Sequence, residues 1–207
     1  MAGMRTRSGR TFSGPSRTTL ARVDAIALEL HHECTLLLGL YRTKESFSPE
    51  LTVGNGRPML SMPPPSSQLS TRDKLWRLYS ALLQCRGLLV RAVTQEEEEF
   101  GGGEGGEYES QRKTVRDRLG HLLDSMRRLL EEVEGAPAIT ANTESIEQID
   151  GPTSGGAFEL KLWIYRIFSE VEHWSRMTTA TLRSIPLVMS TAGGRRAGKR
   201  MRRGKPK

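Results

Sequence analysis

The helix that decides the fold opens with Gly156-Ala157-Phe158-Glu159-Leu160-Lys161-Leu162-Trp163 and is expected to run to Ile185, before Pro186. At about 100° per residue, one set of its side chains falls within roughly 40° of a common direction, the width of an ordinary core stripe. The stripe comprises Leu160, Ile164, Ile167, Val171, Trp174, Thr178, Leu182 and Ile185. Phe158, Leu162 and Tyr165 point almost the opposite way, with Lys161 beside them. Such a second apolar face is either covered by its own chain or binds a partner.

Three more helices are expected upstream, so that the four predicted helices span residues 17–43, 71–99, 108–134 and 157–185. Each carries apolar residues spaced by threes and fours. The three upstream stripes are Leu20, Val23, Ala27, Leu30, Cys34, Leu37 and Tyr41; Leu75, Leu78, Leu82, Cys85, Leu89 and Ala92 or Val93; and Val115, Leu119, Leu122, Met126, Leu129 and Val133. Ser70, with Asp73 three residues later, has the layout of a capping box with Asp in place of Glu.

The connections between these helices predict the topology. Residues 44–70 and 137–156 are long and rich in turn formers, whereas the middle connection is short and glycine-rich. A long connection has enough reach to travel the roughly 40 Å of such a helix. The pattern predicts an all-α, up-up-down-down four-helix bundle over residues 17–186, with two long crossover loops. An ordinary up-down bundle with loose loops remains the alternative.

Basic residues concentrate at the two ends of the chain. The formal net charge is +7, and residues 1–16 and 187–207 are expected to be disordered arms. The tail carries Arg195, Arg196, Lys199, Arg200, Arg202, Arg203, Lys205 and Lys207. Such arms are either plain solvated ends or bind polyanions such as nucleic acid or heparan-type chains. The tail has no aromatic side chain to stack on bases.

Cys34 and Cys85 lie on apolar stripes, so buried free thiols are expected, with a Cys34–Cys85 bridge as the open alternative. The first residues contain no apolar segment typical of a signal peptide, and no run has membrane-spanning length. We therefore expect synthesis in the cytoplasm and, for action outside the cell, release by an unconventional route.

Motifs for catalysis, metals or cofactors are not found. His31 and His32 are adjacent on a helix and point about 100° apart, so they do not converge on one ion. The glycines of 101–106 lack the Lys-Ser/Thr ending of a phosphate loop. The acidic run Glu96–Glu99 beside them is interpreted as a solvated turn. The sequence predicts a protein that is not an enzyme and holds no metal or cofactor.

Three segments of the last helix carry a family resemblance: residues 156–163, Glu172-His173-Trp174-Ser175-Arg176, and Leu182-Arg183-Ser184-Ile185. They combine Phe-x-x-Lys at the start, Leu-Trp directly after it, a second Trp and a late Leu-Arg. This resembles the ciliary neurotrophic factor family, long-chain four-helix cytokines related to leukemia inhibitory factor and cardiotrophin. The likeness covers residues 155–185, and the basic tail and acidic-glycine turn make the chain a divergent member.

The resemblance implies a neurotrophic cytokine that assembles a multi-subunit receptor and promotes neuronal survival and differentiation. Phe158 and Lys161 match the pair that contacts the leukemia inhibitory factor receptor. Arg183 matches a position that contacts the alpha receptor. The common signal-transducing subunit would meet the outer faces of the first and third helices, where Arg22, Glu29, Arg116 and Asp117 are candidates. With this resemblance we expect Leu162 and Tyr165 to be partly covered and Phe158 to be exposed.

Overall fold

The computed structural model describes residues 15–48, 59–60, 62–101, 105–134 and 156–185. These residues form four helices: α1 (Arg17–Lys44), α2 (Thr71–Phe100), α3 (Glu107–Glu134) and α4 (Ala157–Ser184). The observed bounds agree with the predicted ranges to within one residue, because each apolar stripe continues for the whole length of its helix. No strand occurs in the described part of the chain.

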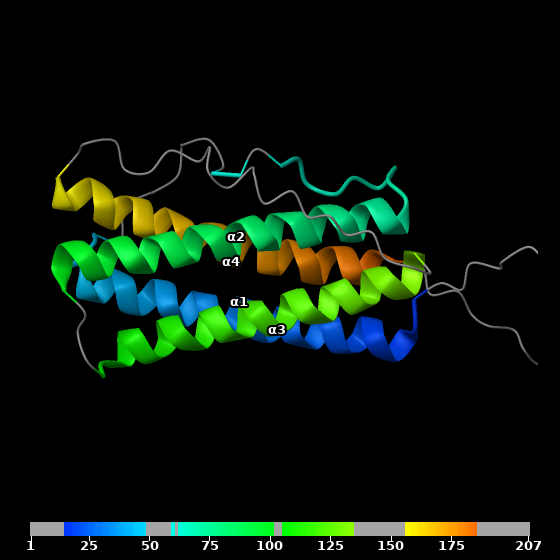
Figure 1. The fold of residues 1–207 in the computed structure, drawn as a ribbon, viewed down its shortest axis with the longest axis horizontal. Helices are drawn as coiled ribbons and strands as arrows, with labels where there is room; N and C mark the ends of the chain where they lie inside the picture. The colour runs from blue at the N-terminus through cyan, green and yellow to red at the C-terminus, as the bar shows by residue number, and fades with distance from the viewer. Residues whose placement is uncertain (1–14, 49–58, 61, 102–104, 135–155, 186–207) are drawn as a thin grey trace, which may run out of the picture.

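The helices form an up-up-down-down bundle, as predicted. Figure 1 shows α1 and α2 running in one direction and α3 and α4 in the other. Ion pairs and hydrogen bonds between helix ends agree: the start of α1 contacts the end of α3 through Ser16 and Glu132, and the end of α1 contacts the end of α2 through Lys44 and Glu96. The alternative of a simple up-down bundle is therefore wrong.

Parallel helices lie diagonally across this bundle. α1 packs against α3 and α4, and α2 packs against the same two helices, so that every packed pair is antiparallel. The end of α1 and the start of α2 lie at opposite ends, as do the end of α3 and the start of α4. Both long connections must therefore cross the length of the bundle, although residues 49–58, 61 and 135–155 lie outside the described residues.

Local sequence explains where α2 and α4 begin or end. The Ser70 side chain accepts a hydrogen bond from the Asp73 amide at 3.1 Å, and the Ser70 hydroxyl donates to the Asp73 carboxylate at 2.6 Å. Ser70 is thus an N-cap, as predicted. α2 ends at Gly101, whose φ of 76° suits a residue without a side chain. α4 ends at Ile185, which is extended as the residue before Pro186 should be.

The core contains the predicted stripes of all four helices, except that Val133, at the end of the α3 stripe, is only partly buried. The α4 stripe from Leu160 to Ile185 is buried throughout. Thr178, a polar member of that stripe, donates its hydroxyl hydrogen to the carbonyl of Trp174 at 2.8 Å. Leu60, in the first connection, is also buried. Residues from that connection therefore complete the core between helices.

Cys34 and Cys85 are free and buried, as first expected. Along the described helices, no Cα atom of α1 lies within 8 Å of a Cα atom of α2. A disulfide requires a Cα separation below about 7 Å. The alternative of a Cys34–Cys85 bridge is therefore incompatible with this packing, because α1 and α2 are diagonal partners.

The predictions of disordered arms concern residues 1–16 and 187–207, of which 1–14 and 187–207 lie outside the described residues. Ser16 is described: it is the residue before α1, and its amide donates to Glu132, so the prediction is wrong for this residue. In the part that the structure does describe, no helix is long and apolar enough to cross a membrane. Within those same ranges, no three His, Cys, Asp or Glu side chains are grouped as they would be around a metal ion.

Candidate protein-binding surface

Phe158, near the start of α4, is the most exposed large apolar side chain of the described chain, at 60%. Its ring packs edge-on against Phe47, with 6.3 Å between ring centroids. Phe47 follows the end of α1 and also packs on Tyr165 at 5.8 Å. Phe47 thus packs against one side of the Phe158 ring, while much of that ring faces solvent. This agrees with the expected exposure.

The other two residues of the second apolar face are covered to different degrees. Leu162 is half-buried, as expected. Tyr165 is more fully buried than expected, at 8% exposure. Phe47 covers its ring, and the Arg42 guanidinium lies 5.2 Å from the ring centroid. The start of the first connection therefore covers the middle of this face and leaves Phe158 open.

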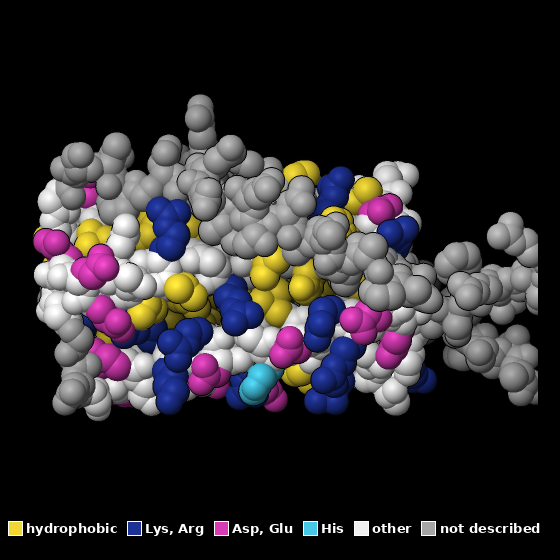
Figure 2. Space-filling model, viewed as in Figure 1, with side chains coloured by type: hydrophobic (Ala, Val, Ile, Leu, Met, Phe, Trp, Pro, Cys, Tyr) yellow, Lys and Arg dark blue, Asp and Glu magenta, His cyan; other side chains and the backbone are white. Residues whose placement is uncertain are grey.

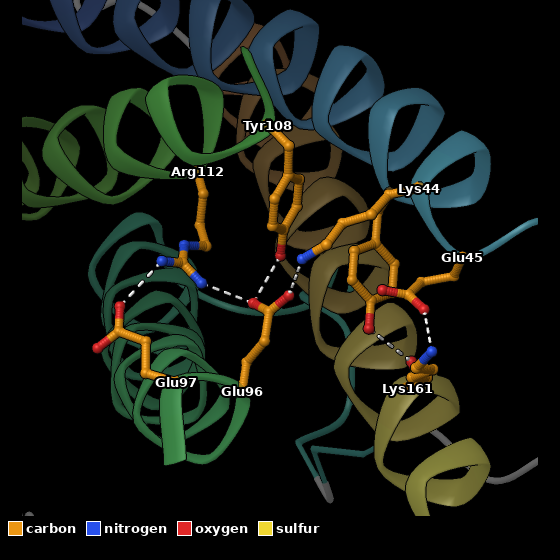
Figure 3. Close-up of polar contacts among 8 residues, drawn as sticks. Lys44, Glu45, Glu96, Glu97, Tyr108, Arg112 and Lys161 are labelled. Carbon is orange, nitrogen blue, oxygen red and sulfur yellow. Dashed lines mark hydrogen bonds and ion pairs between the residues drawn. The ribbon is translucent and has the colours of Figure 1, made fainter. Parts of the chain in front are cut away.

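Lys161 lies one turn after Phe158, but its charge is already paired. Its ammonium forms an ion pair with Glu45, whose side chain is only 6% exposed (Figure 3). The same ammonium lies 5.1 Å from the centroid of the Phe100 ring, at the end of α2. The Lys161 carbonyl accepts a hydrogen bond from the Tyr41 hydroxyl at 3.3 Å. Lys161 therefore connects the ends of α1 and α2 to α4. We call Phe47, Phe100, Phe158 and Lys161 the phenylalanine surface.

A buried carboxylate network underlies this end of the bundle (Figure 3). Glu96 is 3% exposed and accepts from Lys44 at 2.6 Å, from Arg112 at 2.6 Å and from the Tyr108 hydroxyl at 2.7 Å. The interpretation of Glu96–Glu99 as a solvated turn is wrong for Glu96. Its position continues the α2 stripe of Leu89 and Ala92, and residues of α1 and α3 supply its donors. The network joins α1, α2 and α3.

The network also affects the ionisation of the groups around it. Burial raises the pKa of Tyr108, and the Glu96 carboxylate raises it further. Burial likewise raises the pKa of Tyr41, with Glu96 and Glu45 adding to the effect. Burial alone would lower the pKa of Arg112, but the nearby Tyr108 and Glu96 more than offset this, so it is raised. Tyr108 thus stays a neutral hydrogen-bond donor to the Glu96 carboxylate.

Arg183 is exposed at the far end of the bundle and pairs with Asp24 of α1 at 3.1 Å. Beside the pair, a hollow of about 190 Å³ is lined mainly by apolar residues of α1 and α4. Asp24 Oδ1 is buried and has no hydrogen-bond partner among the described residues. Arg183 therefore lies at an open, partly apolar site with an unsatisfied acceptor. Its distance along α4 separates it from the phenylalanine surface.

The candidates on α1 and α3 divide into two groups. Arg22 and Glu29 line one hollow of about 500 Å³ between these helices, together with Arg118, and Arg118 pairs with Glu29. Arg116 and Asp117 do not line it; they pair with each other at 3.6 Å on the outer surface of α3. The structure thus brings together Arg22 and Glu29, with Arg118 as a member that the sequence reasoning missed.

Glu45, Phe47 and Phe100 were also missed as members of a site. All three lie at or just beyond a helix end, where the helical period no longer indicates which way a side chain points. The sequence left open that the chain itself covers the second face of α4, and Phe47, at the start of the first connection, covers Tyr165 there. Trp163 and Trp174, which contribute to the family resemblance, are buried, so they belong to the core.

No family model matches the chain, and a search of curated proteins finds no match. The geometry alone defines a four-helix bundle with an exposed aromatic side chain held on a packed base. Exposed aromatic side chains are enriched at surfaces that bind other macromolecules.

Proposed function

We propose that this chain is a helical cytokine that binds and assembles a multi-subunit receptor, with Phe158 as the anchor of one contact. The observation that carries the proposal is the 60% exposure of Phe158. This residue lies on the face of α4 opposite the core stripe, and every residue of the stripe itself is buried. In this proposal the protein acts as a ligand without catalysis and promotes neuronal survival and differentiation. The up-up-down-down fold is compatible with it, as it is the fold that the resemblance to the ciliary neurotrophic factor family implies.

The packing around Phe158 supports a role in binding. Burying an aromatic ring at an interface yields a large part of the binding energy of many complexes. The edge-on contact with Phe47 restricts the ring before any partner arrives. Because less side-chain entropy is then lost on association, more of the interaction energy contributes to affinity.

The proposal assigns three contacts to three separate parts of the bundle. Phe158 and Lys161 would contact the leukemia inhibitory factor receptor. Arg183 would contact the alpha receptor at the opposite end of α4. Arg22 and Glu29, with Arg116 and Asp117 nearby on α3, would contact the common signal-transducing subunit. Surfaces so separated would let one ligand hold several receptor chains at once.

The testing experiment measures binding of the purified chain to the leukemia inhibitory factor receptor ectodomain, alone and with the alpha and common signalling ectodomains. A Phe158→Ala, Lys161→Ala variant should bind at least about 30-fold more weakly, as expected for loss of a hot spot of about 2 kcal/mol. Val90→Ala is the matched control, since Val90 is 49% exposed on α2. Circular dichroism must show native helicity for both variants.

A second comparison distinguishes the cytokine proposal from a rival hypothesis. In the rival, the protein is an intracellular bundle that binds nucleic acid or other polyanions through its basic tail. The cytokine proposal expects that deletion of residues 190–207 leaves receptor binding intact. The rival expects loss of polyanion binding on that deletion and no effect of Phe158→Ala. Failure of the intact chain to bind any of the three ectodomains, singly or together, would contradict the cytokine proposal.

A further inference from the structure

The phenylalanine surface continues beyond the α4 residues that the family resemblance singles out. Phe100, the last residue of α2, is 39% exposed and lies next to the Lys161 ammonium. Phe100 and Phe158 therefore present two aromatic side chains on either side of Lys161, from different helices. This gives an apolar area that a partner can cover as one surface.

The rim of this apolar area is acidic. Glu97, Glu98 and Glu99 precede Phe100, and Glu159 follows Phe158; all four are exposed. Glu97 pairs with Arg112 at 2.9 Å, whereas Glu98, Glu99 and Glu159 form no ion pair with any described residue. Figure 2 shows acidic side chains predominating at this end of the bundle, at the left of the view, and basic ones in the middle of the visible face.

The positive charges near the rim are already neutralised. Lys161 is paired with Glu45, while Lys44 and Arg112 are paired with the buried Glu96. Glu98, Glu99 and Glu159 are then left without a paired counter-charge within one helical turn of Phe100 or Phe158. The field that an approaching molecule meets here is therefore negative.

Glu98 and Glu99 lie where they do not help the fold, whereas Glu159 lies in the first turn of α4, where a carboxylate is favourable. The last turn of α2 contains no basic residue, and its glutamates lie at the negative end of the helix dipole. Each acidic side chain there destabilises a helix by about 0.3–1 kcal/mol at low ionic strength. Arg112 compensates Glu97, but no described residue compensates Glu98 or Glu99. Their charges thus have no stabilising role in the isolated bundle.

We propose that the phenylalanine surface docks on a receptor site formed by an apolar pocket surrounded by Lys and Arg side chains. This inference rests on the proposed function and adds the chemistry of the partner at that contact. Phe158 and Phe100 fill the pocket, and Glu98, Glu99 and Glu159 meet the basic rim. Lys161 remains paired with Glu45 and positions the surface.

Charges at the rim of an interface act mainly on the rate of association, and apolar anchors act mainly on dissociation. The wild-type association rate constant should therefore fall steeply as salt is raised. A Glu98→Lys, Glu99→Lys variant should associate at least about tenfold more slowly at low salt and show a flatter salt dependence. Lysine suits the end of a helix, so the fold is not at risk.

The experiment measures association and dissociation by surface plasmon resonance on the leukemia inhibitory factor receptor ectodomain over a range of salt concentrations. Asp124→Lys, Glu131→Lys is the control for this one receptor: it makes the same charge change at exposed positions of α3, where Asp124 lines the hollow assigned to the common signal-transducing subunit. We expect its association to match or exceed that of the wild type. An equal loss in both variants would mean that net charge alone is responsible, which would overturn the proposed rim contact.

The two proposals can fail separately. If the Phe158→Ala variant loses binding while Glu98→Lys, Glu99→Lys associates at the wild-type rate, the receptor contact stands and the basic-rim inference is overturned. If the wild type does not bind, both are overturned. If sedimentation shows that the wild type self-associates and the glutamate variant does not, the surface belongs to a second copy with its basic tail, which also overturns this inference.

Discussion

Lys161, near the start of α4, is paired with Glu45, the residue that ends α1. The pair joins a half-exposed ammonium to a carboxylate that is 6% exposed, and the Glu45 amide also closes the last turn of α1 by donating to the Tyr41 carbonyl at 2.9 Å. Glu45 thus ends α1 and, through its ion pair with Lys161, holds the start of the first connection against α4. Phe47, two residues later, supports Phe158 from there.

The first prediction concerns this pair. Glu45→Gln should lower the free energy of unfolding by about 1 kcal/mol, between the values of exposed and buried ion pairs, because Lys161 retains some solvent. A double-mutant cycle with Lys161→Met, measured by urea unfolding, should give a coupling free energy of about 0.5–1.5 kcal/mol. Additive effects of the two substitutions would show that the pair does not stabilise the fold.

The buried Glu96 carboxylate supplies the second prediction. Glu96→Gln keeps the shape of the side chain but leaves Lys44 without its counter-charge and Arg112 with Glu97 alone. The free energy of unfolding should fall by about 2–4 kcal/mol. Glu98→Gln, a change of the same chemistry two residues away on the exposed surface, should stay within about 0.5 kcal/mol of the wild type. Similar losses in both variants, measured by urea denaturation, would contradict the assigned network.

The third prediction separates surface from core phenylalanines. Phe158→Ala should change the free energy of unfolding by less than about 1 kcal/mol, because most of that ring stays in water in the folded state. Phe168→Ala, at a position that is 1% exposed, should cost about 3–5 kcal/mol through lost burial and a cavity. Thermal and urea unfolding monitored by circular dichroism compare the two. A large loss for Phe158→Ala would show that its ring is structural.

The fourth prediction follows from the buried thiols. Burial raises the pKa of both Cys34 and Cys85 above the ordinary value of 9.0. In the unfolded chain the thiols ionise first as pH rises, so their contribution to stability is complete below that value and is lost above it. Above about pH 9, each thiol should lower the free energy of unfolding by up to about 1.4 kcal/mol per pH unit.

Urea unfolding of the wild type and of a Cys34→Ala, Cys85→Ala variant from about pH 8 to pH 10 tests this linkage. The variant should start less stable, because it has lost buried volume, but its stability should depend less on pH over that range. Parallel pH profiles for the two proteins would contradict it.

The bundle could be derived from the sequence because it depends on two features that the sequence shows directly. These are the helical period of the apolar residues and the lengths of the connections. The stripe from Leu160 to Ile185 repeats at the helical period, so burial follows from position alone. The lengths of the connections decide which helices can be parallel. The same reasoning placed Phe158 outside the core, since it lies opposite that stripe.

The features that could not be derived from the sequence depend on side-chain contacts between different helices. Glu96 occupies a stripe position, but whether a glutamate there is buried depends on Lys44 and Arg112, which come from other helices. Tyr165 is buried more deeply than expected because Phe47, just past the end of α1, turns onto it. The helical period gives no direction for such residues, and their contacts are set by how the whole bundle is assembled.

The diagonal placement of parallel helices has a consequence for folding. Of the packed pairs, only α2 and α3 are joined by a short connection, so they are the pair whose association loses the least chain entropy on loop closure. α1 and α4 are packed neighbours although α2, α3 and all three connections lie between them in the sequence. Glu45 and Lys161 therefore meet only when the first and the last helix of the bundle have come together. The phenylalanine surface is thus expected to form last and to open first, so that its presence reports a completely folded molecule.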